Sequence, residues 1–207
     1  MPLNQGKLDA ASQLVRTTPA RFPDNERSLW VEWTGGVMVT EMRIQPALSI
    51  REIRPDEFEL VWPLFHTVLA AGDTYAYSPG LGVEDARKIW TAPPARAFVA
   101  ELDGAVVATY SLRPNQPGLG DHVANAGYMV EPAARGQGIA RALCEHSIET
   151  ARQAGFTAMQ FNFVVSSNEA AVRLWQRCGF RIVGQVPGAF RHRERGATDV
   201  FIMHRFL

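Results

Sequence analysis

The chain has 207 residues, 46% of them hydrophobic, which is enough for one domain with a sizeable core or for one domain plus an extension. Basic and acidic residues both number 21, and this neutral balance argues against broad nucleic-acid binding, which needs a strongly basic face. The sequence lacks an apolar run long enough to cross a membrane and a secretory signal layout, so we expect a soluble, cytoplasmic protein.

Charge and cysteine content narrow the kinds of site to expect. Residues 1–130 carry 11 basic and 15 acidic residues, whereas residues 131–207 carry 10 and 6, so the C-terminal part is better suited to an anion. Cys144 and Cys178 have no CxxC partner, which argues against a disulfide or a zinc site. We interpret both as buried, reduced thiols and expect no metal.

The first third of the chain begins with an extension. This extension comprises residues 1–47. A β-hairpin is predicted within it, in which residues 28–33 and 37–44 flank Thr34-Gly35-Gly36. A strand is predicted at 48–53, followed by a helix that starts near Pro55 and keeps helical spacing to Leu69. Residues 71–82 are predicted as a loop and 84–90 as a short helix.

The rest of the chain alternates strands and helices. Strands at 95–101 and 105–112 are joined by a hairpin at Asp103-Gly104, and a strand at 123–130 ends before Pro132. An amphipathic helix follows at 138–154, then a strand at 157–165 and a helix closed by Gly179. Two last strands bracket a predicted loop at 187–198. This order predicts an α/β domain over 48–207, with a mixed sheet and helices on both faces.

The turn before the helix at 138 predicts an anion site. The first N–H groups of a helix lack partners and carry partial positive charge, and Gly136 and Gly138 let main chain approach a ligand. Arg135 and Arg141 add charge, so a pyrophosphate fits; a glycine loop that only turns the chain is the alternative. The turn has neither the Gly-Lys-Ser/Thr of a Walker loop nor the third glycine of a dinucleotide fingerprint.

Two motifs carry a resemblance to a known superfamily. They are Arg135-Gly136-Gln137-Gly138-Ile139-Ala140, which matches a Q/R-x-x-G-x-G/A acyl-CoA signature, and Asn168-x-x-Ala171-x-x-Leu174-Trp175-x-x-x-Gly179-Phe180. At this separation they resemble the GCN5-related N-acetyltransferase (GNAT) superfamily, over about residues 48–207.

The resemblance implies a mostly antiparallel sheet with an acyl-CoA cleft between two splayed central strands, one ending at Val130 and the other at 158–165. Acetyl-CoA would be the acyl donor. Main-chain amides of 136–141 would hold its pyrophosphate, and main-chain groups near Met129 and Val130 would pair with pantetheine and polarise the thioester carbonyl. The implied cofactor-binding residues are Met129, Val130, Arg135, Gly136, Gln137, Gly138, Ile139, Ala140, Arg141, Asn168 and Trp175.

A finer likeness concerns the acceptor. The stretches GDTY (72–75), ANAGYMV, FNFVVSSN and PGAFRH resemble the N-acetyltransferases of azetidine-2-carboxylate and other proline analogues. The likeness makes Asn125, Asn162 and Asn168 the catalytic candidates, with Asn125 and Asn162 also lining the acceptor pocket; Asn168 is equally interpreted as a helix N-cap. By analogy Asp73, Thr74 and Tyr75 border the same pocket.

The proton-transfer groups depart from the superfamily's pattern. Trp175 stands where most members carry a tyrosine that protonates the leaving thiolate, and an indole cannot do so. Water, Tyr128 or an unprotonated thiolate are the alternatives. For the base, the strand at 123–130 has no glutamate, so a water held by Asn125 and Asn162 or an already neutral amine is expected, with His122 as the competing candidate.

The sequence therefore predicts an enzyme that transfers acetyl from acetyl-CoA to a small amine, such as an amino acid or analogue. A protein N-terminal acetyltransferase and a non-catalytic acyl-CoA-binding module remain open. A nucleoside-phosphate binder is a third alternative. The basic segment Arg191–Arg195 is either a carboxylate-binding loop or a solvated tip. The extra hairpin at 28–44 is compatible with a homodimer.

Overall fold

The chain divides into two compact units, Met1–Pro46 and Ala47–Leu207. The computed structural model describes residues 27–29, 42–44 and 48–207. In the first unit, β1 (Arg27–Leu29) pairs antiparallel with β2 (Met42–Ile44). Thr34-Gly35-Gly36, the predicted turn of the N-terminal hairpin, lies outside the described residues.

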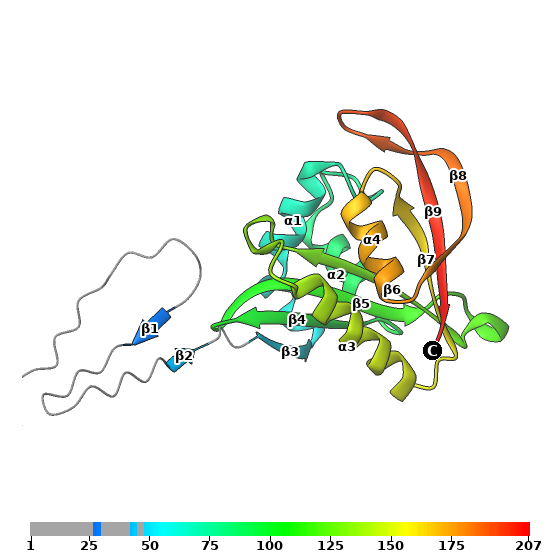
Figure 1. Cartoon of the computed structure of the whole chain (residues 1–207). Coiled ribbons are helices and arrows are strands. Elements are labelled where there is room, and N and C mark those ends of the chain that lie inside the picture. Colours follow the sequence, from blue (N-terminus) through cyan, green and yellow to red (C-terminus); the bar gives the residue numbers. More distant parts are fainter. Residues whose placement is uncertain (1–26, 30–41, 45–47) are drawn as a thin grey trace, which may run out of the picture. The chain divides into compact units, whose positions relative to one another are not determined.

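The second unit is built on a seven-stranded sheet in the order β3-β4-β5-β6-β7-β9-β8 (Figure 1). Its strands are β3 (Leu48–Ile53), β4 (Arg96–Leu102), β5 (Ala105–Pro114), β6 (Val123–Val130), β7 (Ala158–Val165), β8 (Arg181–His192) and β9 (Gly196–Phe206). Neighbouring strands are antiparallel except β6 and β7, which are parallel. The predicted mixed, mostly antiparallel sheet is confirmed.

Helices pack on both faces of this sheet, as predicted. They are α1 (Trp62–Ala71), α2 (Val83–Thr91), α3 (Ile139–Gln153) and α4 (Glu169–Arg177), with short 3-10 turns at Pro55–Leu60, Gly118–Gly120 and Pro132–Ala134. Alternate side chains of a strand point to opposite faces. On β4, Val99 packs in a cluster with α1 and α2, whereas Phe98 packs in a cluster with α3 and α4.

Turn and cap residues explain several boundaries. Asp103 and Gly104 join β4 to β5 with positive φ angles of 50° and 82°, the conformation that a tight two-residue hairpin requires. After α4, Gly179 adopts a left-handed φ of 86°, which ends the helix. At the other end of α4, Asn168 caps the helix by accepting the N–H of Ala171 at 3.2 Å.

The C-terminal hairpin is longer than the sequence indicated. Residues 187–198 were predicted as a loop, but β8 extends to His192 and β9 begins at Gly196. The prediction of a loop was wrong because a register shift between Val186 and Phe190 accommodates Pro187 outside the regular ladder. Asp199 stabilises this irregularity, since its carboxylate accepts the N–H of Gly188 at 2.8 Å.

The two cysteines differ in burial. Cys144 on α3 is fully enclosed, whereas Cys178, directly after α4, is half-buried, so the prediction of two buried thiols was wrong for Cys178. Both are free thiols. Within the described residues, no helix is both long enough and apolar enough to span a membrane.

Candidate active site

The central feature of the second unit is a fork between β6 and β7. These parallel strands pair only at Val123 with Ala158 and at Ala124 with Met159. Beyond that point β7 continues to pair with β9, and β6 continues to pair with β5. The two strands therefore splay apart, as the resemblance implied, and leave one side of β6 without a strand partner.

The hydrogen-bond register shows which main-chain groups of β6 face the fork. Bonded and non-bonded residue pairs alternate in an antiparallel ladder. The N–H of Glu131 donates to the carbonyl of Val107 at 2.8 Å. The N–H of Asn115 donates to the carbonyl of Val123 at 2.7 Å. Odd-numbered residues of β6 thus direct their main-chain groups to β5, and even-numbered residues direct theirs into the fork.

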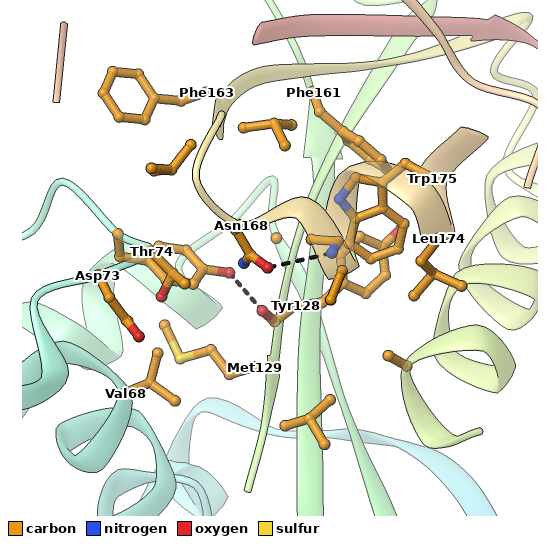
Figure 2. A pocket seen from close by; sticks show the side chains of 18 of the residues that line it. Val68, Asp73, Thr74, Tyr128, Met129, Phe161, Phe163, Asn168, Leu174 and Trp175 are labelled. Carbon is orange, nitrogen blue, oxygen red and sulfur yellow. Dashed lines mark hydrogen bonds between the residues drawn. The ribbon is translucent and has the colours of Figure 1, made fainter. Parts of the chain in front are cut away.

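Val130 and Tyr128 are the residues that present main-chain groups at the open end of β6. The hydroxyl of Tyr75 donates to the carbonyl of Tyr128 at 2.9 Å, drawn as a dashed line beside Tyr128 in Figure 2. The register directs the N–H of Tyr128 to the fork as well. Met129 instead directs its main chain to Thr109 of β5 and buries its side chain toward α1 and α2. The register therefore selects Val130, and not Met129, for main-chain contact in the fork.

The turn before α3 has the features of an anion site. Gly136 and Gly138 adopt left-handed φ angles of 83° and 80°, and a Cβ built on either would meet no atom within 4 Å. No side chain caps the first turn of α3, so its leading N–H groups are free to bind a ligand. The buried side chains of Ala134 and Ile139 fix the ends of this otherwise exposed turn.

A cavity of about 1440 Å³ connects this turn to the fork and to the loop after α1. Figure 2 shows Asp73 and Thr74 on one side of it and Leu174 and Trp175 on the other. Nearly all of the predicted site residues line it: Asp73, Thr74, Tyr75, Asn125, Met129, Val130, Arg135, Gly136, Gly138, Ile139, Ala140, Arg141, Asn162, Asn168 and Trp175. Gln137 belongs to the same turn but is not among the lining residues.

The asparagines of β6 and β7 meet through a third asparagine that sequence reasoning missed. The Nδ2 atoms of Asn125 and Asn162 both donate to Oδ1 of Asn115, at 3.1 and 2.6 Å. Asn115 directly follows β5 and does not line the cavity. It links the strands at the root of the fork, where main-chain pairing ends. Only the order of strands in the sheet brings these three residues together, and no local sequence signal marks Asn115.

Aromatic side chains form one wall of the cavity. The ring of Trp175 lies 4.8 Å from that of Tyr128 and 5.2 Å from that of Phe161. The hydroxyl of Tyr128 lies 2.7 Å from Oγ of Ser147, which itself donates to the carbonyl of Cys144. Burial raises the pKa of Tyr128 well above its ordinary value. Trp175 is a packing residue in this wall, and the Tyr128 hydroxyl is held by α3.

Two segments that are distant in sequence meet on the side of the cavity lined by Asp73 and Thr74. Arg193, in the turn between β8 and β9, donates its N–H to the carbonyl of Gly72 at 3.1 Å and Nη1 to that of Ala70 at 3.0 Å. Residues 192–195 of this basic segment line the cavity, whereas Arg191 does not. His122, in contrast, is exposed before β6 and does not line the cavity.

Two buried polar atoms that belong to lining residues have no hydrogen-bond partner. They are Oδ1 of Asp73 and Oγ of Ser167. Polar atoms in such positions are costly unless a ligand or water satisfies them. Across the described part of the chain, no group of three or more His, Cys, Asp or Glu side chains is placed to hold a metal ion.

Comparisons with known proteins agree with this geometry. Residues 49–180 match the model of the acetyltransferase (GNAT) family. The chain belongs to this family. A GCN5-related N-acetyltransferase from Kribbella flavida is 44% identical, with a TM-score of 0.74 over 78% of this chain and 98% of that one. The structure of yncA from Salmonella typhimurium with its cofactor acetyl-CoA shares the fold at 21% identity, with a TM-score of 0.70 over 78% of this chain and 94% of that one.

Curated relatives are similar over shorter stretches. N-acetyltransferase aca1 of Schizosaccharomyces pombe is 31% identical over 115 residues, which cover 54% of this chain and 55% of that protein. Mycothiol acetyltransferase of Thermomonospora curvata is 29% identical over 146 residues, which cover 68% of this chain and 46% of that protein. The chain thus spans about half the length of these relatives.

Proposed function

We propose that this protein transfers an acetyl group from acetyl-CoA directly to the amine of a small molecule, an amino acid or an amino-acid analogue. The observation that carries the choice of a small acceptor is the contact of Arg193 with Gly72 and Ala70. This contact links the loop after α1 to the β8–β9 turn over the proposed acceptor side, whereas a groove without such a bridge would suit a protein N-terminus. The cavity volume of about 1440 Å³ also exceeds the roughly 300–1000 Å³ of a single small-ligand site, which suits two substrates.

The donor half of the cleft is assigned to the turn and the fork. The main-chain N–H groups of the turn and of the first residues of α3, between Gly136 and Arg141, would hold the pyrophosphate of acetyl-CoA, with Arg135 adding charge. The main chain of Val130 would pair with the pantetheine arm, and the N–H of Tyr128 points into the same fork. An N–H group directed at the thioester oxygen stabilises the negative charge that develops there.

The acceptor half is assigned to side chains. Asn125 and Asn162 would orient the acceptor, because an amide can donate to a carboxylate and accept from an amine. The free Oδ1 of Asp73 would hold the ammonium group. A water bound to the asparagines would then remove the proton before attack. Asn168 would act indirectly, because it caps α4 and so fixes the start of a helix that lines the cavity.

The reaction needs no enzyme nucleophile, since a thioester is already activated. The neutral amine attacks the carbonyl carbon and a C–N bond forms. The nitrogen then loses its proton to water, and the C–S bond breaks as CoA leaves as a thiolate. Because the Tyr128 hydroxyl is bound to Ser147 and its pKa is raised, we propose that water, and not Tyr128, protonates the thiolate.

The test is thiol release from acetyl-CoA with a panel of amino acids, azetidine-2-carboxylate, simple amines and short peptides. Turnover with amino acids and little with peptides is the expected result. Preferential turnover with peptides would replace this proposal by an N-terminal protein acetyltransferase. CoA binding without turnover on any acceptor would leave a non-catalytic acyl-CoA-binding module. Stronger thermal protection by ATP than by CoA would instead indicate a nucleoside-phosphate binder.

A further inference from the structure

Arg113 is a half-buried cation that lines the acceptor side of the cavity. It lies on β5 directly opposite Asn125 of β6, in a hydrogen-bonded pair of the ladder, so both side chains are on the same face of the sheet. This is the face covered by α1 and α2. Arg113 is therefore a neighbour of the asparagine already assigned to the acceptor.

The guanidinium of Arg113 is anchored but not neutralised. Its Nη1 donates to the carbonyl of Ile89 in α2 at 3.2 Å. Among the described residues it forms no ion pair with a carboxylate. Arg96, on the neighbouring strand β4, shows the contrast, because its Nε and Nη2 donate to the two oxygens of Glu52 at 2.9 and 2.7 Å. Glu52 thus binds the guanidinium of Arg96 through two hydrogen bonds, whereas no described carboxylate binds the guanidinium of Arg113 in this way.

The missing partner has a definite chemistry. A planar guanidinium fork matches a carboxylate in a bidentate manner, and a half-buried charge loses part of its hydration, which a bound anion replaces. A negatively charged side chain in the same cavity also lacks a partner, since the buried Oδ1 of Asp73 forms no hydrogen bond. Arg113 and Asp73 do not pair with each other. One small molecule that carries both an ammonium and a carboxylate would satisfy both.

We propose that Arg113 binds the carboxylate of the acceptor and thereby makes the enzyme selective for amino acids over amines that lack this group. The inference rests on the proposed function and deepens it, because it assigns the acceptor's carboxylate to a particular side chain. Asp73 then marks the ammonium end of the same molecule. Asn125, opposite Arg113, is placed to donate to the same carboxylate.

The test compares each amino acid with its carboxamide, which has the same side chain but no negative charge. Steady-state KM and kcat are measured for L-proline, azetidine-2-carboxylate and other L-amino acids, each matched with its carboxamide, in wild type, Arg113→Gln and Arg113→Lys. Arg181→Gln is the control, because Arg181 is exposed on β8 and does not line the cavity. Thermal denaturation confirms that each variant is folded.

We expect Arg113→Gln to raise the KM for amino acids about 10- to 100-fold, with kcat little changed and with the KM for carboxamides unchanged. Arg113→Lys should recover part of the loss, and Arg181→Gln should behave as wild type. Equal effects of Arg113→Gln on acids and carboxamides, or no effect on either, would overturn the inference alone. Wild-type turnover of simple amines but not of amino acids would overturn it as well. Absence of turnover with every amine would overturn the proposed function.

Discussion

Under the proposed function, the two ends of the cleft would recognise their ligands by different means. The donor end offers main chain: two left-handed glycines, the uncapped start of α3 and the even-numbered residues of β6. The proposed acceptor end offers side chains from separate segments, namely Asp73 after α1, Arg113 on β5, Asn125 on β6 and Asn162 on β7. Substitutions at the donor end should therefore act through backbone conformation, and those at the acceptor end through single functional groups.

The largest effect is expected from Gly138→Val. A β-branched residue at a φ of 80° costs about 1–2 kcal/mol of strain and moves N–H groups that would bind the pyrophosphate. CoA affinity, measured by calorimetry, should fall about 100-fold. Gly104→Val is the matched control, since Gly104 has a φ of 82° and equally open surroundings in the β4–β5 turn. Equal loss of CoA binding in both variants would refute main-chain recognition at Gly138.

Asn162→Ala is expected to have a smaller effect than Gly138→Val, and on the acceptor KM instead of the CoA affinity. Loss of one amide should raise the KM for the acceptor about tenfold, because one hydrogen bond to a charged group is removed, and should leave CoA affinity unchanged. Gln176→Ala is the control, because this exposed amide on α4 does not line the cavity. A change in CoA affinity with an unchanged acceptor KM would reverse the assignment of the two ends.

Asn115→Ala tests whether the acceptor amides must be held in place. Asn115 accepts from both Asn125 and Asn162, so its loss should raise the acceptor KM about fivefold, with kcat and CoA affinity retained. Asn115→Asp keeps an accepting oxygen and should restore the wild-type KM for a carboxamide acceptor, which carries no carboxylate for the new negative charge to repel. If the alanine and aspartate variants show the same KM, Asn115 does not position these amides.

The smallest effect is expected from Tyr128→Phe, where the two ends meet. The hydroxyl contacts Ser147 on α3, so its removal should cost about 1 kcal/mol of folding stability and change kcat less than twofold. Chemical denaturation and steady-state kinetics measure the two quantities. A large loss of kcat with normal KM values would instead identify Tyr128 as the proton donor and contradict protonation of the thiolate by water.

The same contrast explains what the sequence could predict. The donor end lies within one short stretch, so the spacing of Gly136 and Gly138 before an amphipathic helix was sufficient to indicate an anion site. The sheet with helices on both faces also followed from local patterns. Asn115 and Arg113 could not be found in this way, because their significance depends on strand order and register, which place them against Asn125. The Pro187-Gly188 irregularity misled the prediction because a bulge accommodates these residues inside a strand.

A crystal structure of the protein with bound coenzyme A tests the central claim most directly. The account predicts that pyrophosphate oxygens accept hydrogen bonds from main-chain N–H groups of residues 136–141, with the pantetheine arm lying along Val130 in the fork. Coenzyme A bound elsewhere, with this turn making no contact to its phosphates, would contradict the account.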